Sequence, residues 1–188
     1  MADENSKMRL KYNAPVILTF SLACALALLI DKTVYAGFIQ RYLTVGTSLA
    51  EPLDWFRLFG HIAGHASWGH FYGNLLYLLL LGPIVEERYG SVRTLVMVLI
   101  TAVVTGLINV FFMSSGLLGA SGIVFMLIIL ASIVNVRRKE IPITFIAVII
   151  LFLGQELLKV GANDNVSHWG HLVGGATGGA LGFWHNNK

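Results

Sequence analysis

Four polar residues lie inside apolar stretches of this sequence, and their side chains are of the kinds that catalyse acyl transfer. Ser121 carries a hydroxyl, His70 and His171 carry imidazoles, and Asn74 carries an amide. A serine within reach of a histidine forms a nucleophile and a general base, and the same histidine later protonates the leaving amine. The residue types therefore indicate serine hydrolase chemistry, provided that the fold brings a histidine to Ser121.

Such chemistry also needs hydrogen-bond donors for the developing oxyanion. His70 and Asn74 are four residues apart, so they share one face of a helix, and both side chains can donate. The backbone N–H of Ser121 is a third candidate donor. Gly119 and Gly122 flank this serine and allow backbone and substrate to approach closely.

Each of these residues also has a structural interpretation. A serine in an apolar helix commonly bonds its own backbone, so Ser121 and its flanking glycines are a weak signal alone. His171 could ligate a cofactor or bond another helix, and His70 and Asn74 could join helices by hydrogen bonds. The catalytic hypothesis depends on whether separate segments place the four side chains together.

The composition identifies the elements that must position them. The chain has 188 residues, of which 56% are hydrophobic and 12% charged, and its mean hydropathy is +0.73. An ordinary soluble domain has about 25% charged residues. This balance excludes a soluble enzyme and a disordered chain, and it predicts a single all-α domain, residues 1–188, embedded in the lipid bilayer.

The lone Cys24 excludes a disulfide framework. The net charge of +3 is typical of a membrane protein with basic cytoplasmic loops, so we expect no nucleic-acid partner.

Uncharged stretches separated by charged clusters predict six transmembrane helices. Their expected ranges are about 12–30, 69–85, 94–113, 117–136, 141–158 and 168–184. Residues 1–11 would form a cytoplasmic tail, and residues 31–68 would form an outer loop. Of the 13 lysines and arginines, nine fall on the side of the two termini and four on the opposite side. This asymmetry predicts that both termini are cytoplasmic.

The N-terminal stretch has an alternative interpretation as a signal peptide. Residues 7–36 have a basic start, an apolar core and a small-residue site at 34–36. However, the core is long for a signal peptide, and Asp31 and Lys32 interrupt the approach to the site. We therefore favour a retained membrane anchor.

This topology places the candidate residues at one depth. The second, fourth and sixth spans all run inward, and His70, Ser121 and His171 each lie near the outer start of one of them. With a rise of 1.5 Å per residue, the four polar groups all belong to the outer leaflet.

A stripe of glycines predicts which helices pack together. Gly174, Gly178 and Gly182 lie on the same helical face as His171. Because small residues let helix backbones approach closely, we expect this face to pack on the span that contains Ser121. The alternative is a homodimer contact, which would not explain an imidazole on the same stripe.

Together these motifs resemble the rhomboid family of intramembrane serine proteases. The resemblance extends from Trp55 to Trp184, and its motifs are His70-x3-Asn74, Gly119-x-Ser121-Gly122 and His171-x2-Gly174-x3-Gly178. The segment Glu86-Glu87-Arg88-Tyr89-Gly90 resembles the acidic–basic–glycine segment of the family. Arg57, with its aromatic neighbours, resembles the family's tryptophan–arginine motif, although Phe56 stands directly before the arginine.

The resemblance implies specific roles for these residues. Ser121 would be the nucleophile, His171 the base, and His70 and Asn74 oxyanion donors, without a catalytic aspartate, cofactor or metal. Arg57 and Glu86 would be structural. Phe125 replaces a tyrosine that often packs on the catalytic imidazole and would retain the stacking surface. His168 is a competing base, and His61 and His65, which match loop histidines of the family, are expected to make loop hydrogen bonds rather than bind metal.

The family also implies a fold, a substrate and a location. The fold would have six helices and a first outer loop partly within the membrane. Substrates would be single-pass membrane proteins cut at or near the outer membrane boundary, and the compact size favours a multi-pass protein of a bacterial inner membrane. The alternative is a non-proteolytic rhomboid-like protein that binds transmembrane clients. The intact serine and histidine favour the enzyme.

Overall fold

The computed structural model describes residues 11–133, 143–154, 158 and 168–186, and these residues are predominantly helical. The elements are α1 (Pro15–Thr33), α2 (Phe38–Tyr42), α3 (Pro52–Gly60), η1 (His61–Ala63), α4 (Trp68–Tyr89), α5 (Ser91–Phe112), α6 (Ser121–Ile133), α7 (Ile143–Val148), the π-helical η2 (Ile149–Leu153) and α9 (His168–Asn186). Pairing of extended backbone in the described part is limited to one antiparallel bridge between Val45 and Leu117. The predicted all-α class is confirmed.

Two of the described helices are long and apolar enough to cross a membrane by length and composition, namely α1 and α5. A further apolar helix, α6, has 13 residues within the described part. The number of six spans and the cytoplasmic location of both termini remain predictions.

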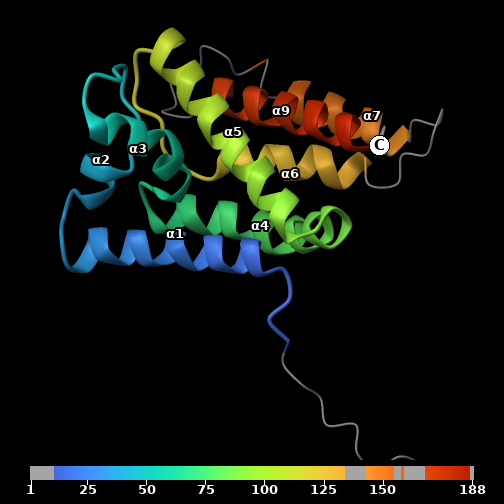
Figure 1. Cartoon of the computed structure of the whole chain (residues 1–188), viewed down its shortest axis with the longest axis horizontal. Coiled ribbons are helices and arrows are strands. Elements are labelled where there is room, and N and C mark those ends of the chain that lie inside the picture. The colour runs from blue at the N-terminus through green and yellow to red at the C-terminus, as the bar shows by residue number, and fades with distance from the viewer. Residues whose placement is uncertain (1–10, 134–142, 155–157, 159–167, 187–188) are drawn as a thin grey trace, which may run out of the picture.

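The centre of the molecule is α6. Every residue from Ile123 to Leu130 is buried, so this helix is apolar on all sides, as expected of a helix enclosed by others. Helices α4, α5, α7 and α9 pack against it (Figure 1). Ser121, the first residue of α6, therefore stands at the end of the best-enclosed element.

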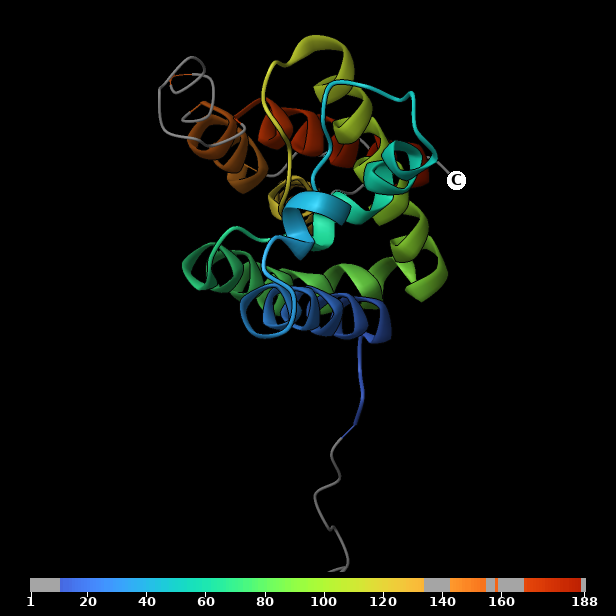
Figure 2. The same ribbon diagram turned by 90° about the vertical axis from the view of Figure 1, so that its left-hand side faces the viewer.

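Helices α4, α6 and α9 begin at the same end of the bundle (Figure 1). The successive contacts of α9 with α6, from Gly174 at Gly122 to Gly182 at Ile133, show that these two helices run parallel. Viewed from that end, α2 and α3 lie across the bundle between α1 and α4 on one side and α5 and α9 on the other (Figure 2). One end of the molecule thus gathers three helix starts beneath a loop region.

Helix α4 supports α1 in two ways. Gly82 lies against Ile17 so closely that a Cβ on this glycine would be 2.6 Å from the Ile17 Cγ2. One turn further along α4, the buried carboxylate of Glu86 accepts hydrogen bonds from the backbone N–H groups of Val16 and Ile17, both 3.0 Å long. The N-cap of α1, Ala14, makes no side-chain cap bond, so Glu86 supplies the cap from another helix.

Helix α6 begins four residues later than the predicted start of the fourth span at residue 117. Leu117 instead exchanges two backbone hydrogen bonds with Val45, of 2.9 and 3.0 Å. Gly119 has a φ of +115°, which a helix cannot contain. Residues 117–120 are therefore a loop, and the apolar character that indicated a helix comes from burial against the segment between α1 and α4, which is the predicted outer loop. Parts of the predicted spans 117–136 and 141–158 lie outside the described residues.

Candidate active site

The loop before Ser121 is positioned by the outer loop. The backbone N–H of Gly119 donates to the carbonyl oxygen of His61 over 2.9 Å. A Cβ on Gly119 would lie 2.8 Å from the Cε1 and Nε2 atoms of His70, so the His70 ring packs directly against this glycine. The positive φ of Gly119 and this close approach both require glycine two residues before the candidate nucleophile.

His171 lies beside the first turns of α6. Its imidazole stacks on the ring of Phe125, with centroids 4.6 Å apart and planes 9° from parallel. Phe125 is four residues after Ser121 and thus one helical turn along the same face of α6. The expected stacking surface is present, and it places the imidazole on the side of α6 that carries Ser121.

Glycines on α9 allow this approach. A Cβ on Gly174 would overlap the backbone of Gly122, the residue after Ser121. A Cβ on Gly178 would lie 2.8 Å from the Cα and carbonyl oxygen of Met126. The structure thus brings Gly174 and Gly178 of α9 into backbone contact with α6, whereas Gly182 meets the side chains of Leu130 and Ile133.

His70 and Asn74 face the same region from α4. Asn74 is buried and donates from its side-chain nitrogen to the carbonyl oxygen of His70 over 3.1 Å. The His70 ring meets His65 edge-on, at 5.0 Å between centroids. The His70 ring contacts Gly119, and Gly174 contacts Gly122, so α4 and α9 both approach the residues that flank Ser121.

The two outer-loop histidines bond loop carbonyls, as expected. His61 Nδ1 donates to the Arg57 carbonyl over 3.2 Å, and His65 Nδ1 donates to the Ala63 carbonyl over 3.2 Å. Burial lowers the pKa of both imidazoles to about 4, with a contribution at His65 from the charge of His70. Both rings are therefore neutral near neutral pH. In the part of the chain that the structure describes, no group of three or more His, Cys, Asp or Glu residues could hold a metal ion.

Arg57 joins α3 to the end of α2. Its Nη1 pairs with the Asp54 carboxylate at 2.6 Å, and its Nε donates to the Arg41 carbonyl over 3.1 Å. The second amino group of Arg57 contacts the same carbonyl. These bonds join α3 to α2 and so support a structural role for Arg57.

The competing base, His168, lies next to His171. Its ring is buried and meets His171 at 6.1 Å between centroids and 88° between planes. The ring that stacks on Phe125 belongs to His171, whereas His168 stands one turn earlier on α9. The geometry therefore places His171, and not His168, against Phe125, one turn after Ser121.

Two contacts that shape this site could not be predicted from the sequence. The carbonyl of His61 holds Gly119, and the ring of His65 packs against His70. His61 and Gly119 are far apart in the sequence. Because every residue has a backbone carbonyl, the residue type at position 61 does not indicate this bond. The available signal was that His61 and His65 match loop histidines of the family that the sequence resembles, but this match did not specify which groups they contact.

Comparisons with known proteins find relatives of one family. A family model described as the Rhomboid domain matches residues 52–187. Rhomboid protease GlpG of Enterobacter sp. (strain 638) is 30% identical over 173 residues, which cover 90% of this chain and 62% of that protein. Rhomboid protease GluP of Bacillus subtilis (strain 168) is 32% identical over 133 residues, which cover 68% of this chain and 26% of that protein. The chain thus spans less than two thirds of the length of these relatives.

Proposed function

Because this chain belongs to the rhomboid family, we propose that it is an intramembrane serine endopeptidase with Ser121 as nucleophile and His171 as general base. The observation that carries the proposal is the packing of α9 on α6. The backbone contact of Gly174 with Gly122 and the stacking of His171 on Phe125 bring the imidazole to the turn of α6 that begins with Ser121.

The proposed reaction has two stages. Ser121 Oγ attacks the scissile carbonyl carbon while its proton passes to His171, and the carbonyl oxygen becomes an oxyanion. His171 then gives this proton to the leaving amine as the C–N bond breaks, which leaves an acyl ester on Ser121. Water attacks this ester with His171 again as base, and the ester bond breaks to release the acid and restore the hydroxyl.

The oxyanion donors are His70, Asn74 and the backbone N–H of Ser121. The ring of His70 packs against Gly119, two residues from the nucleophile, so a donor on this ring is held in place before substrate arrives. Asn74 uses one side-chain N–H on the His70 carbonyl, and its second N–H remains for the oxyanion. Donors that are fixed in advance need no rearrangement during the reaction.

The substrates we propose are single-pass membrane proteins, cut at or near the outer membrane boundary. Support comes from the common end at which α4, α6 and α9 begin, because all the candidate groups lie near these helix starts (Figure 1). The proposed location is the bacterial inner membrane, with six spans and both termini in the cytoplasm. The asymmetry of lysines and arginines supports this orientation.

A serine-reactive fluorophosphonate tests the proposal directly. We expect it to label the purified protein in detergent and to block cleavage of a fluorescent single-pass substrate. Ser121→Ala should remove both labelling and cleavage while the protein still purifies. Ser115→Ala is the matched control, because this serine is exposed in the loop before α6. A Ser121→Ala preparation that cleaves at the unaltered rate would refute the mechanism, and an unlabelled, inactive wild type would favour the client-binding alternative.

A further inference from the structure

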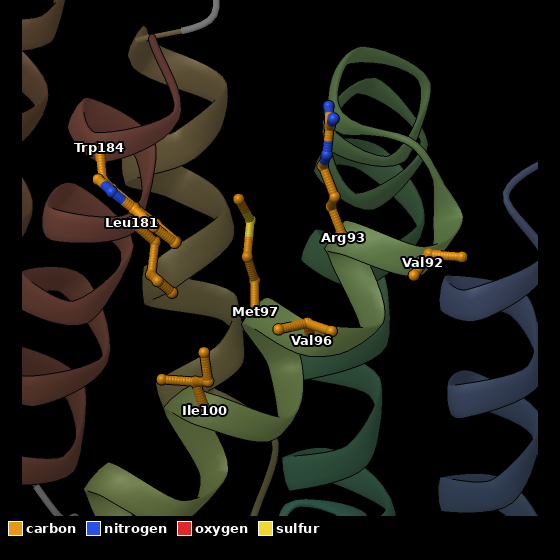
Figure 3. Close-up of a pocket in the computed structure, with 7 residues that line it drawn as sticks. All are labelled: Val92, Arg93, Val96, Met97, Ile100, Leu181 and Trp184. Carbon is orange, nitrogen blue, oxygen red and sulfur yellow. The ribbon is translucent and has the colours of Figure 1, made fainter. Parts of the chain in front are cut away.

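A groove runs along the outside of the bundle between α5 and the second half of α9. It has a volume of about 520 Å³ and is lined by Arg93, Val96, Met97, Ile100, Leu181 and Trp184. Arg93 and Trp184 lie at the end where α5 begins, and Ile100 lies at the opposite end (Figure 3). The groove is therefore apolar along its length and carries a cation at one end.

The groove lies on an exposed surface rather than in the core. Val96 and Ile100 are 48% and 38% exposed, and Trp184 is 64% exposed. In a protein of the bilayer, exposed apolar side chains contact lipid tails. A groove of this shape between two helices fits a flexible hydrocarbon chain that lies along the helix axes.

The charged end of the groove lies near the ends of two helices. Arg93 is in the first turn of α5, and Trp184 is in the last turns of α9. Tryptophan is enriched at the membrane–water interface, and a long arginine side chain near a helix end reaches toward the headgroups. These preferences favour a lipid headgroup at this end of the groove.

The sign of the charge selects the headgroup. A guanidinium forms paired hydrogen bonds with phosphate oxygens. The start of α5 has no side-chain cap bond, so the positive end of its dipole adds to the charge of Arg93. Basic pockets between transmembrane helices on the cytoplasmic side favour anionic lipids.

From these observations we propose that the groove between α5 and α9 is a binding site for an anionic phospholipid, with one acyl chain along Val96, Met97 and Ile100 and the phosphate at Arg93. This site lies at the end of the bundle opposite the helix starts that carry the catalytic candidates. It is independent of the proposed proteolytic activity.

Native mass spectrometry of the full chain in detergent tests the proposal. The delipidated protein is mixed with equal amounts of phosphatidylglycerol and phosphatidylcholine that have identical acyl chains. We expect the phosphatidylglycerol adduct to be favoured about fivefold, the effect of one interfacial cation. Arg93→Gln should abolish this preference. Arg88→Gln is the control, because it removes a positive charge from the exposed end of α4, outside the groove. This variant should keep the preference for phosphatidylglycerol.

A second pair of variants tests the apolar part. Ile100→Trp fills the groove and should lower the retention of both lipids, whereas Leu99→Trp should not, because Leu99 is equally exposed at 38% but does not line the groove. Circular dichroism and elution volume verify that each variant folds. The proposal is wrong if the two lipids bind equally to the wild type, if the preference survives Arg93→Gln, or if Ile100→Trp changes nothing. It is also wrong if Ile100→Trp abolishes a dimer instead of a lipid adduct.

Discussion

His70 is fixed from two sides in the absence of any substrate. Gly119 leaves no space for a side chain beside the ring, and His65 packs against its edge at 5.0 Å. Asn74, four residues later, is tied to the His70 carbonyl. Both side chains are therefore held in one arrangement, as electrostatic stabilisation of an oxyanion requires.

This arrangement predicts separate effects for donors and nucleophile. His70→Ala and Asn74→Ala should each lower kcat by about 10²–10³-fold, because one donor is lost while the others remain. Both variants should still react with a fluorophosphonate at Ser121, and the double variant should be slower than either. Tyr77→Phe, on an exposed part of α4, is the control. If both single variants cleave at the wild-type rate, His70 and Asn74 only join helices.

At the scale of elements, the contact of α9 with α6 determines where His171 lies. Gly178 and Gly179 are neighbours on α9, but only the first meets α6 backbone. A Cβ on Gly178 would lie 2.8 Å from the Met126 backbone, whereas a Cβ on Gly179 would be 3.8 Å from the nearest side-chain atom, on Ile129. Substituting alanine at either glycine changes helix propensity equally, but only the change at Gly178 disturbs the packing on α6. Comparing the two variants therefore separates the two effects.

Gly178→Ala should push α9 away from α6 and displace His171. A displacement of about 1 Å can lower a catalytic rate about 100-fold, so we expect a fall of this order in kcat together with a lower Tm in detergent. Gly179→Ala should retain both kcat and Tm. Equal behaviour of the two variants would show that the stripe does not set the position of His171.

Glu86 is a second element-scale contact, because it caps α1 from α4. Glu86→Ala leaves the N–H groups of Val16 and Ile17 without their carboxylate partner and should destabilise the protein by about 1–3 kcal/mol. Glu87→Ala removes the neighbouring, exposed carboxylate and should have little effect. Thermal unfolding in detergent measures both, and similar Tm values for the two variants would contradict the capping role.

The sequence predicted those placements of the candidate residues that depend on the regular spacing of residues along a helix. Helix spacing places His70 with Asn74 and His171 with the glycine stripe, and topology places Ser121 at their level. The sequence could not predict three contacts, namely the partner of Glu86, the Val45–Leu117 pairing and the bond from Gly119 to His61. These contacts join segments that are far apart in the chain, and their backbone partners have no residue signature.

For the whole molecule, the outer loop and the bundle are joined through buried neutral histidines. His61 and His65 are both buried, and each donates to a loop carbonyl. The backbone carbonyl of His61 also accepts a hydrogen bond from the Gly119 N–H. This bond joins the loop that contains the two histidines to the loop before Ser121. Charging either imidazole would place a buried cation at this junction.

The pH dependence of stability follows from these two rings. Burial lowers the pKa of His61 and His65 to about 4 in the folded state, whereas an unfolded histidine titrates near ~6.5. Between these values the unfolded chain binds more protons, so the free energy of unfolding falls as pH decreases from ~6.5 toward 4. Each histidine contributes up to about 1.4 kcal/mol per pH unit. Thermal midpoints measured in detergent between pH 7.5 and 4.5 should therefore decline below about pH 6.5, and His65→Gln should make the decline shallower. A flat wild-type profile over this range, or an equal slope in His65→Gln, would contradict the prediction.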